Sequence, residues 1–216
     1  LIAYACGGEV AAILDLGAYD LRIKPNTYAN PKRQFRNELT YNVCPLDYFS
    51  ESLAWQLKER LGGLSDVSDS NALVKSPTCG KVIQDIPGTA KGNWFAPNID
   101  TALSGHEPPH LALVQGHINQ SLQAFSNGDS TKTSNLEMGL YYFEPKNSGL
   151  VNLDFSKVRP DGKVYCYQTK NTYKNSELTT IIIQLTDSET LKIEGLNTAG
   201  CGSGPWSFSH PTEFKR

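Results

Sequence analysis

His106, Glu107 and His110 form the string H-E-x-x-H within the stretch GHEPPH. On a continuous helix this spacing would place two imidazoles on one zinc ion, with the glutamate acting as the general base of a hydrolase. The two intervening residues are Pro108 and Pro109, which remove backbone donors and disfavour the helical conformation of the residue before each of them. The sequence therefore predicts an extended segment, with His110 opening a strand HLALVQ, instead of a zinc-peptidase helix.

A looser metal site is the alternative, because loops can bring ligands together from separate parts of a chain. His106, His110 and His117 would be its ligands. In the other interpretation His110 packs partly into the core, while the remaining two histidines occupy exposed turns. We expect no catalytic residue and no cofactor, since no G-x-S-x-G elbow joins a strand to a helix and no glycine-rich loop leads into one.

The chain has five cysteines, of which Cys6, Cys44, Cys79 and Cys201 lie beside turn-type residues, and none forms a CxxC or CxxH pair that would indicate structural zinc. This pattern favours an oxidising compartment, extracellular or periplasmic, with two disulfides. We predict the pairs Cys44–Cys79 and Cys166–Cys201, with Cys6 left unpaired. The alternative is five reduced, buried thiols in a cytosolic protein.

The N-terminal third contains the signals of a few short strands and one helix. Residues 9–24 are strand-like, with apolar and polar side chains alternating near their end. Residues 50–61 carry apolar side chains at helical spacing, with Ser50 as a suitable N-cap and Gly62-Gly63 as a stop. Residues 64–78 are polar and rich in serine, which indicates a domain boundary or an exposed loop.

The rest of the chain predicts an antiparallel meander. Short runs such as HLALVQ, GLYYFE, LVNLDF and LTTIIIQL are rich in β-branched and aromatic residues and are separated by turn signals such as RPDGK and TDSET. Roughly eight or nine strands would fit a small closed barrel or a two-sheet sandwich. We therefore expect a mainly β fold, with a small α+β segment over residues 1–75 and an antiparallel β-barrel or β-sandwich over residues 76–216.

Six aromatic residues of the β domain are candidates for ligand contact. Small barrels bind ligands inside or at one mouth, and exposed tyrosines on one face would suit a saccharide or a peptide. At least half of the six are expected to pack in the core instead. The candidates are Trp94, Tyr141, Tyr142, Tyr165, Tyr167 and Trp206.

The tripeptide Gly92-Asn93-Trp94 opens the predicted meander and resembles the Gly-x-Trp of the calycin group, which includes lipocalins, fatty-acid-binding proteins and avidin. In that group the tryptophan closes one end of an antiparallel barrel, and a basic residue near the C-terminus packs across it. Lys215 and Arg216 are the candidates for that basic residue here. The resemblance implies a small closed barrel.

Several phrases resemble a group of uncharacterised secreted bacterial proteins; they are CPLDYF, IPGTAKGNWF, PHLALV, NLDFSKV, PDGKVYCY and PWSF. The N-terminal part is similar to a remnant of the LytM-type zinc peptidases, since AYACGGEV resembles the turn before their last active-site strand. Ile13 and Asp15 stand where those peptidases have the two histidines of an H-x-H strand, and their upstream H-x-x-x-D pair is absent from the chain. The resemblance therefore implies a non-catalytic module that begins partway through that fold.

Three functions follow from these patterns. The first is a secreted, non-enzymatic protein that binds a small molecule, a saccharide or a surface protein through its β domain. The second is an extracellular metal-dependent hydrolase related to cell-wall peptidases, and the third is a structural or assembly subunit that self-associates through free strand edges. A net charge of −2 without a basic run argues against nucleic acid, and no apolar run reaches the roughly 20 residues of a membrane helix.

Overall fold

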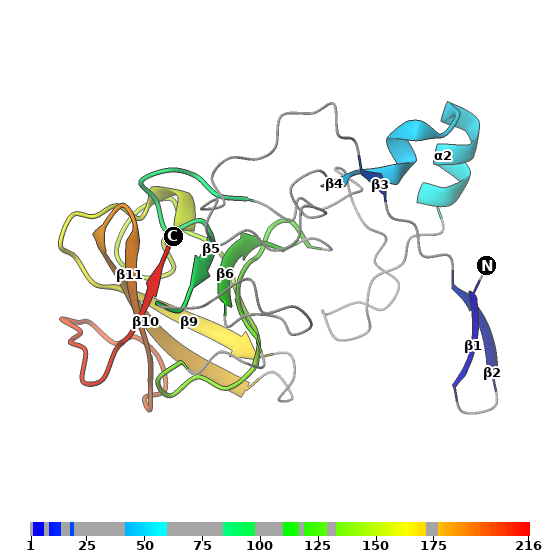
Figure 1. The fold of residues 1–216 in the computed structure, drawn as a ribbon. Coiled ribbons are helices and arrows are strands. Elements are labelled where there is room, and N and C mark those ends of the chain that lie inside the picture. The colour runs from blue at the N-terminus through cyan, green and yellow to red at the C-terminus, as the bar shows by residue number, and fades with distance from the viewer. Residues whose placement is uncertain are drawn as a thin grey trace.

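The computed structural model contains a closed antiparallel β-barrel and two smaller, two-stranded sheets (Figure 1). The structure describes residues 2–6, 9–13, 18–19, 42–59, 84–97, 110–116, 119–128, 133–171 and 177–216. The mainly β fold predicted from the sequence is confirmed, and of the two predicted architectures the chain adopts the barrel. The barrel strands lie within the predicted β domain, whereas the predicted boundary near residue 75 falls outside the described residues.

The barrel is an up-and-down meander in which each strand pairs with its neighbours in the chain, and β12 closes the sheet on β5. Its strands are β5 (Gly92–Phe95), β6 (His110–Gln115), β7 (Gln123–Asn127), β8 (Gly139–Phe143), β9 (Tyr165–Asn171), β10 (Glu177–Asp187), β11 (Thr190–Leu196) and β12 (Thr212–Lys215). The predicted strand HLALVQ is β6, and the predicted turn TDSET joins β10 to β11. Closure matters because it pairs the two outer strands of the meander with each other.

The N-terminal part contributes short elements. They are the hairpin of β1 (Ile2–Cys6) and β2 (Glu9–Ile13), the pair of β3 (Ala18–Tyr19) and β4 (Asn42–Val43), the 3-10 helix η2 (Pro45–Tyr48) and the helix α2 (Glu51–Lys58). The predicted helix is confirmed as α2, and the Oγ of Ser50 accepts a hydrogen bond from the backbone N–H of Leu53 at 3.4 Å. Ala54 is buried, whereas Leu53 and Trp55 are exposed. The predicted stop at residues 62–63 lies outside the described residues.

Side chains fill the interior of the barrel. Phe125, Phe143, Phe155 and Tyr167 form an aromatic cluster whose neighbouring ring centroids lie 4.8–6.0 Å apart, the edge-on and tilted spacing that aromatic rings favour. Phe155 opens the 3-10 helix η3 (Phe155–Lys157), which belongs to the connection between β8 and β9 and not to a barrel strand. The run LVNLDF, which was predicted to be a strand, is therefore not a barrel strand, and its last residue, Phe155, packs inside the barrel. The interior is a packed core.

Trp94 belongs to this core. Its side chain is fully buried, and its indole Nε1 donates a hydrogen bond to the carbonyl of Ala90 at 2.8 Å. The guanidinium of Arg216 lies over the indole ring, 3.9 Å from the ring centroid. Of the two basic candidates, Arg216 makes this contact, while the ammonium of Lys215 pairs with the carboxylate of Glu213 at 3.0 Å.

Arg216 also faces a buried carboxylate. Its Nε lies 3.7 Å from Oδ1 of Asp85, and the two side chains are 2% and 3% exposed. The guanidinium donates further hydrogen bonds to backbone carbonyls of the segment 86–93. A side chain at Gly92 would clash with Asp85, and the φ of +123° at this position also favours glycine. Gly92, Trp94, Asp85 and Arg216 therefore form one packed unit, hereafter the Asp85–Arg216 unit.

The ionisation of Asp85 predicts a pH-dependent stability. Burial raises the pKa of Asp85, although hydrogen bonds from Asn93 and the charge of Arg216 act in the opposite direction. A carboxyl whose pKa is raised on folding loses stability as the pH rises from its unfolded value of about 4 towards the folded value. Because Asp85→Asn removes this titration, we expect its free energy of unfolding, relative to wild type, to increase with pH across that window. Urea denaturation at a series of pH values measures the difference; a flat or falling difference would contradict the prediction.

Candidate functional site

Four of the six aromatic candidates, Trp94, Tyr141, Tyr165 and Tyr167, belong to the barrel core. Trp94 is fully buried, the hydroxyl of Tyr141 donates to the carbonyl of Glu137 at 2.8 Å, and that of Tyr167 donates to the carbonyl of Leu153 at 2.9 Å. Burial raises the pKa of Tyr167 well above its ordinary value, with the neighbouring Tyr165 and the charge of Asp154 acting in the same direction. These side chains stabilise the core, and their contact with a ligand stays a prediction.

The two remaining candidates and the hydroxyl of Tyr165 lie in separate places. Tyr142 is half-buried on β8, where it pairs with Lys170 of β9. Trp206 packs against the outside of the barrel, and its Nε1 donates to the carbonyl of Cys201 at 2.5 Å. The ring of Tyr165 packs in the core while its hydroxyl reaches Asp161. The six aromatic residues therefore do not form one common binding face.

The histidine prediction is tested only in part, because His106, His117 and Asp15 lie outside the described residues. His110 is half-buried and begins β6, as the extended interpretation of GHEPPH predicted. Among the residues that the structure describes, no three His, Cys, Asp or Glu side chains are grouped so that they could hold a metal ion. No helix in the described part of the chain is long and apolar enough to cross a membrane.

The predicted Cys166–Cys201 disulfide is present, with an Sγ–Sγ distance of 2.04 Å. It joins β9 to the segment 197–211, which packs on the outside of the barrel. Cys44 is disulfide-bonded as well. Its predicted partner, Cys79, lies outside the described residues, so that pairing and the prediction of an unpaired Cys6 stay predictions.

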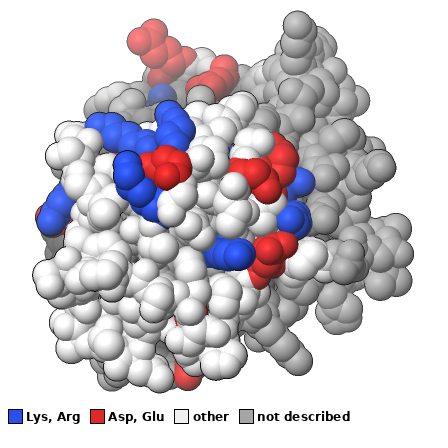
Figure 2. All heavy atoms as spheres, turned by 90° about the vertical axis from the view of Figure 1, so that its left-hand side faces the viewer, with Lys and Arg blue, Asp and Glu red and all other residues white. Residues whose placement is uncertain are grey.

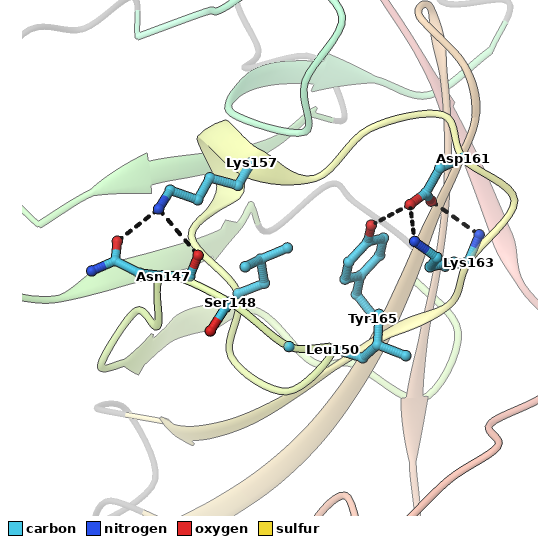
Figure 3. Close-up of a pocket in the computed structure, with 9 residues that line it drawn as sticks. Asn147, Ser148, Leu150, Lys157, Asp161, Lys163 and Tyr165 are labelled. Atoms are coloured by element: carbon cyan, nitrogen blue, oxygen red, sulfur yellow. Dashed lines mark hydrogen bonds and ion pairs between the residues drawn. The ribbon is translucent and has the colours of Figure 1, made fainter.

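An open depression of about 520 Å³ lies on the connection between β8 and β9, at the start of β9 (Figure 3). We call it the β8–β9 depression. It is lined by Asn147, Ser148, Gly149, Leu150, Leu153, Lys157, Asp161, Lys163 and Tyr165. Leu150 supplies exposed apolar surface above the nearly buried Leu153 and Tyr165, while lysine, asparagine and aspartate side chains supply a polar rim.

Backbone hydrogen bonds to β9 shape the floor of the depression. The N–H of Cys166 donates to the carbonyl of Leu150 at 2.9 Å, and the N–H of Asn152 donates to the carbonyl of Cys166 at 2.8 Å. These bonds form a short parallel pairing beside β9, at a place where β8 has already left the sheet. Because Phe155 anchors the same connection in the core, the depression is built on a fixed backbone.

The two lysines of the depression are held in place. Lys157 Nζ donates to the backbone carbonyl of Asn147 at 3.1 Å and to its Oδ1 at 2.8 Å. Lys163 Nζ pairs with Oδ2 of Asp161 at 3.0 Å, and its backbone N–H donates to Oδ1 of the same carboxylate at 3.1 Å. Both ammonium groups therefore stay at the rim of the depression.

Asp161 and Tyr165 have complementary protonation states. Burial opposes the ionisation of Asp161, but hydrogen bonds from Lys163 and Tyr165 outweigh it and lower the pKa of this carboxyl below its ordinary value. Burial, together with the hydrogen bond and charge of Asp161, raises the pKa of Tyr165 to about 12. At neutral pH the carboxylate is therefore ionised, and the phenol donates to it at 2.9 Å.

Sequence reasoning identified only Tyr165 among the lining residues. Lys157 and Lys163 were not predicted as site residues because each lies near a turn signal, and exposed lysines are common in turns. The available signal was the pair of turns PKNSG and RPDG on either side of one apolar run, which indicates a long connection that folds back on itself.

The polar groups that line the depression come from lysine, aspartate, asparagine, serine and tyrosine. Its nine lining residues include no cysteine and no histidine, so they offer neither a thiol nucleophile nor an imidazole base. Figure 2 shows basic and acidic side chains interspersed on the face that it presents, without the continuous basic stripe typical of nucleic-acid binding. Comparisons with protein-family models, with curated proteins and with solved structures find no match to this chain.

Proposed function

We propose that this protein is a secreted, non-enzymatic binding protein that holds its ligand or surface partner in the β8–β9 depression, on the outside of the barrel. The observation that carries the proposal is that the connection between β8 and β9 contributes both to the barrel core and to the depression. Its residues Leu153 and Phe155 belong to the barrel core, and Leu153 together with more exposed residues of the same connection lines the depression. Because side chains fill the described barrel interior, the proposed site is this depression, which combines apolar and polar groups as ligand sites do.

The disulfide supports the secreted part of the proposal. Cys166 and Cys201 are both buried within an apolar cluster on the outer face of the barrel. Structural disulfides of this kind persist in oxidising compartments and are rare in the cytosol. This chemistry supports an extracellular or periplasmic location.

The protonation states of the depression support binding over catalysis. A general acid or base works best with a pKa near the operating pH. Asp161 has a lowered pKa, and that of Tyr165 is about 12, so neither group is poised near neutrality. In the hydrogen bond between them the proton stays on the hydroxyl of Tyr165 and the negative charge stays on Asp161.

Filling the depression should abolish binding. Leu150 is 39% exposed on its floor, so Leu150→Trp occupies the space without disturbing the core. We expect a panel of neutral and anionic fragments to shift the backbone amide NMR signals of residues 147–165 in wild type. The same fragments should bind Leu150→Trp at least about ten-fold more weakly, which corresponds to roughly 1.4 kcal/mol.

Leu178→Trp is the matched control, because Leu178 is 66% exposed on β10 and does not line the depression. It should leave fragment binding unchanged. Fragment-induced shifts that fall on core strands such as β10, or that leave residues 147–165 untouched, would refute the proposed site.

A further inference from the structure

We infer that the β8–β9 depression recognises an anionic group, a carboxylate, sulfate or phosphate, carried on a ring-sized ligand, with Lys157 and Lys163 as the contacting residues. This inference rests on the proposed function and specifies the ligand class of the same site. It follows from the lysine N–H donors at the rim that are not used by hydrogen bonds within the protein.

The acceptors of the rim are engaged within the protein. Oδ1 and the backbone carbonyl of Asn147 both accept from Lys157. The carboxylate of Asp161 accepts from the hydroxyl of Tyr165 and from both the backbone and the side chain of Lys163. A ligand that offers only donors would have to compete with these bonds.

The donors of the rim have capacity to spare. A lysine ammonium carries three N–H donors. Lys157 uses two of them on Asn147, and Lys163 uses its ammonium on a single carboxylate, so each retains at least one donor for a ligand. A ligand with acceptors can therefore bind these ammonium groups without displacing an internal bond, and ionised oxygen acceptors form the strongest hydrogen bonds with ammonium donors.

The charge and the shape of the depression agree with this assignment. Two ammonium groups and one carboxylate line it, so its lining is positive by one charge although the whole chain carries −2. Figure 3 shows Lys157 and Lys163 on opposite sides, with Leu150 and Tyr165 between them. This arrangement suits a small ring or short carbon skeleton over the apolar middle and an anionic group at the rim.

Asn147 and Asp161 act as positioning residues. By holding the two ammonium groups in the free protein, they reduce the side-chain entropy that a ligand would otherwise have to remove on binding. They do not themselves need to touch the ligand.

The test compares glucuronate with glucose, which share a ring and differ by a carboxylate, and includes inorganic sulfate as a free anion. Each is titrated into the full chain and followed through the backbone amides of residues 147–165. We expect glucuronate to bind at least about five-fold more tightly than glucose, and sulfate to shift the same amides. Raising the ionic strength from about 0.01 M to 0.15 M should weaken both anions, because the site is exposed and screened by salt.

Two lysine variants separate this inference from its alternatives. Lys157→Met and Lys163→Met should each weaken glucuronate binding about five-fold, the upper range for an exposed ion pair. Lys170→Met is the matched control, since Lys170 is exposed on β9 away from the depression, and it should have no effect. Unchanged amide spectra outside residues 147–165 show that each variant is folded.

Equal binding of glucose and glucuronate, or full glucuronate binding by Lys157→Met and Lys163→Met, would overturn the anionic assignment and leave the depression as a site for neutral ligands. Absence of any shift with glucuronate and sulfate, while neutral fragments bind wild type but not Leu150→Trp, would do the same. Failure of all fragments at the depression would instead refute the proposed function itself.

Discussion

Arg216→Met is expected to lower the free energy of unfolding by about 3–5 kcal/mol, the usual cost of removing one partner from a buried ion pair. The variant leaves the carboxylate of Asp85 buried without its cation, and it removes the guanidinium from the face of Trp94. It also leaves carbonyls of the segment 86–93 without their donor. Urea denaturation followed by tryptophan fluorescence measures the loss.

Lys215→Met is the control for this prediction. Lys215 is the adjacent basic residue, but its side chain is 35% exposed and its ion pair with Glu213 lies at the surface. Exposed ion pairs contribute little, so we expect a change below about 1 kcal/mol. Asp85→Asn combined with Arg216→Met should recover part of the loss, since no charge is then buried alone. A loss for Arg216→Met no larger than that for Lys215→Met would show that the Asp85–Arg216 unit does not stabilise the barrel.

Cys166→Ala combined with Cys201→Ala is expected to cost about 3–4 kcal/mol. The bond closes a loop between residues 35 apart in sequence, and breaking it restores the conformational freedom of that loop in the unfolded chain. It also holds Trp206 and the segment 197–211 against the outer face of the barrel. Chemical denaturation of the double variant under non-reducing conditions gives the cost, and reductant is avoided because Cys44 is disulfide-bonded too.

Each single variant, Cys166→Ala or Cys201→Ala, should lose nearly as much as the double variant, because either one removes the bond. Amide hydrogen exchange should then accelerate mainly in the segment 197–211, whose other anchors include the backbone N–H groups of Ser209 and His210 on the carboxylate of Glu194. A cost below about 1 kcal/mol, or uniform acceleration across the barrel, would mean that the disulfide does not act as a local clamp.

The strand meander was predictable because its signals are local. The alternation in HLALVQ, the turn residues in TDSET and the serine before α2 each act within a few residues, and each appears in the structure at the expected place. A local preference also favoured a strand at His110, since the residue before a proline avoids the helical conformation whatever surrounds it. His110 accordingly begins a strand.

The sequence predicted that Lys215 or Arg216 would pack on Trp94, but it did not predict that Arg216 would also pair with Asp85. Its partner Asp85 carries no local signal, because a lone aspartate before a turn is ordinary in any sequence. Barrel closure brings the chain segments of Asp85, Trp94 and Arg216 together. Only then does burial raise the cost of an unpaired charge enough to make the three residues one unit.

In the candidate site, too, residue types could be read from the sequence but their positions in the fold could not. Aromatic residues attract attention as ligand contacts, but in a narrow barrel the inward positions need large side chains, and Tyr141 and Tyr167 fill them. The run LVNLDF has the composition of a strand, yet the connection that contains it leaves the sheet and inserts Phe155 into the core. The depression forms where this connection leaves the sheet.

The sequence by itself determined the mainly β class and the positions of β6, the β10–β11 hairpin and the helix α2. These features depend on local backbone preferences and on residue types that have few alternative uses. Only the tertiary structure decided that the sheet closes into a barrel, that Asp85 joins Arg216, and that Lys157 and Lys163 face each other across an apolar floor. Those outcomes depend on which distant side chains meet once the interior is filled, and no spacing along the chain specifies that.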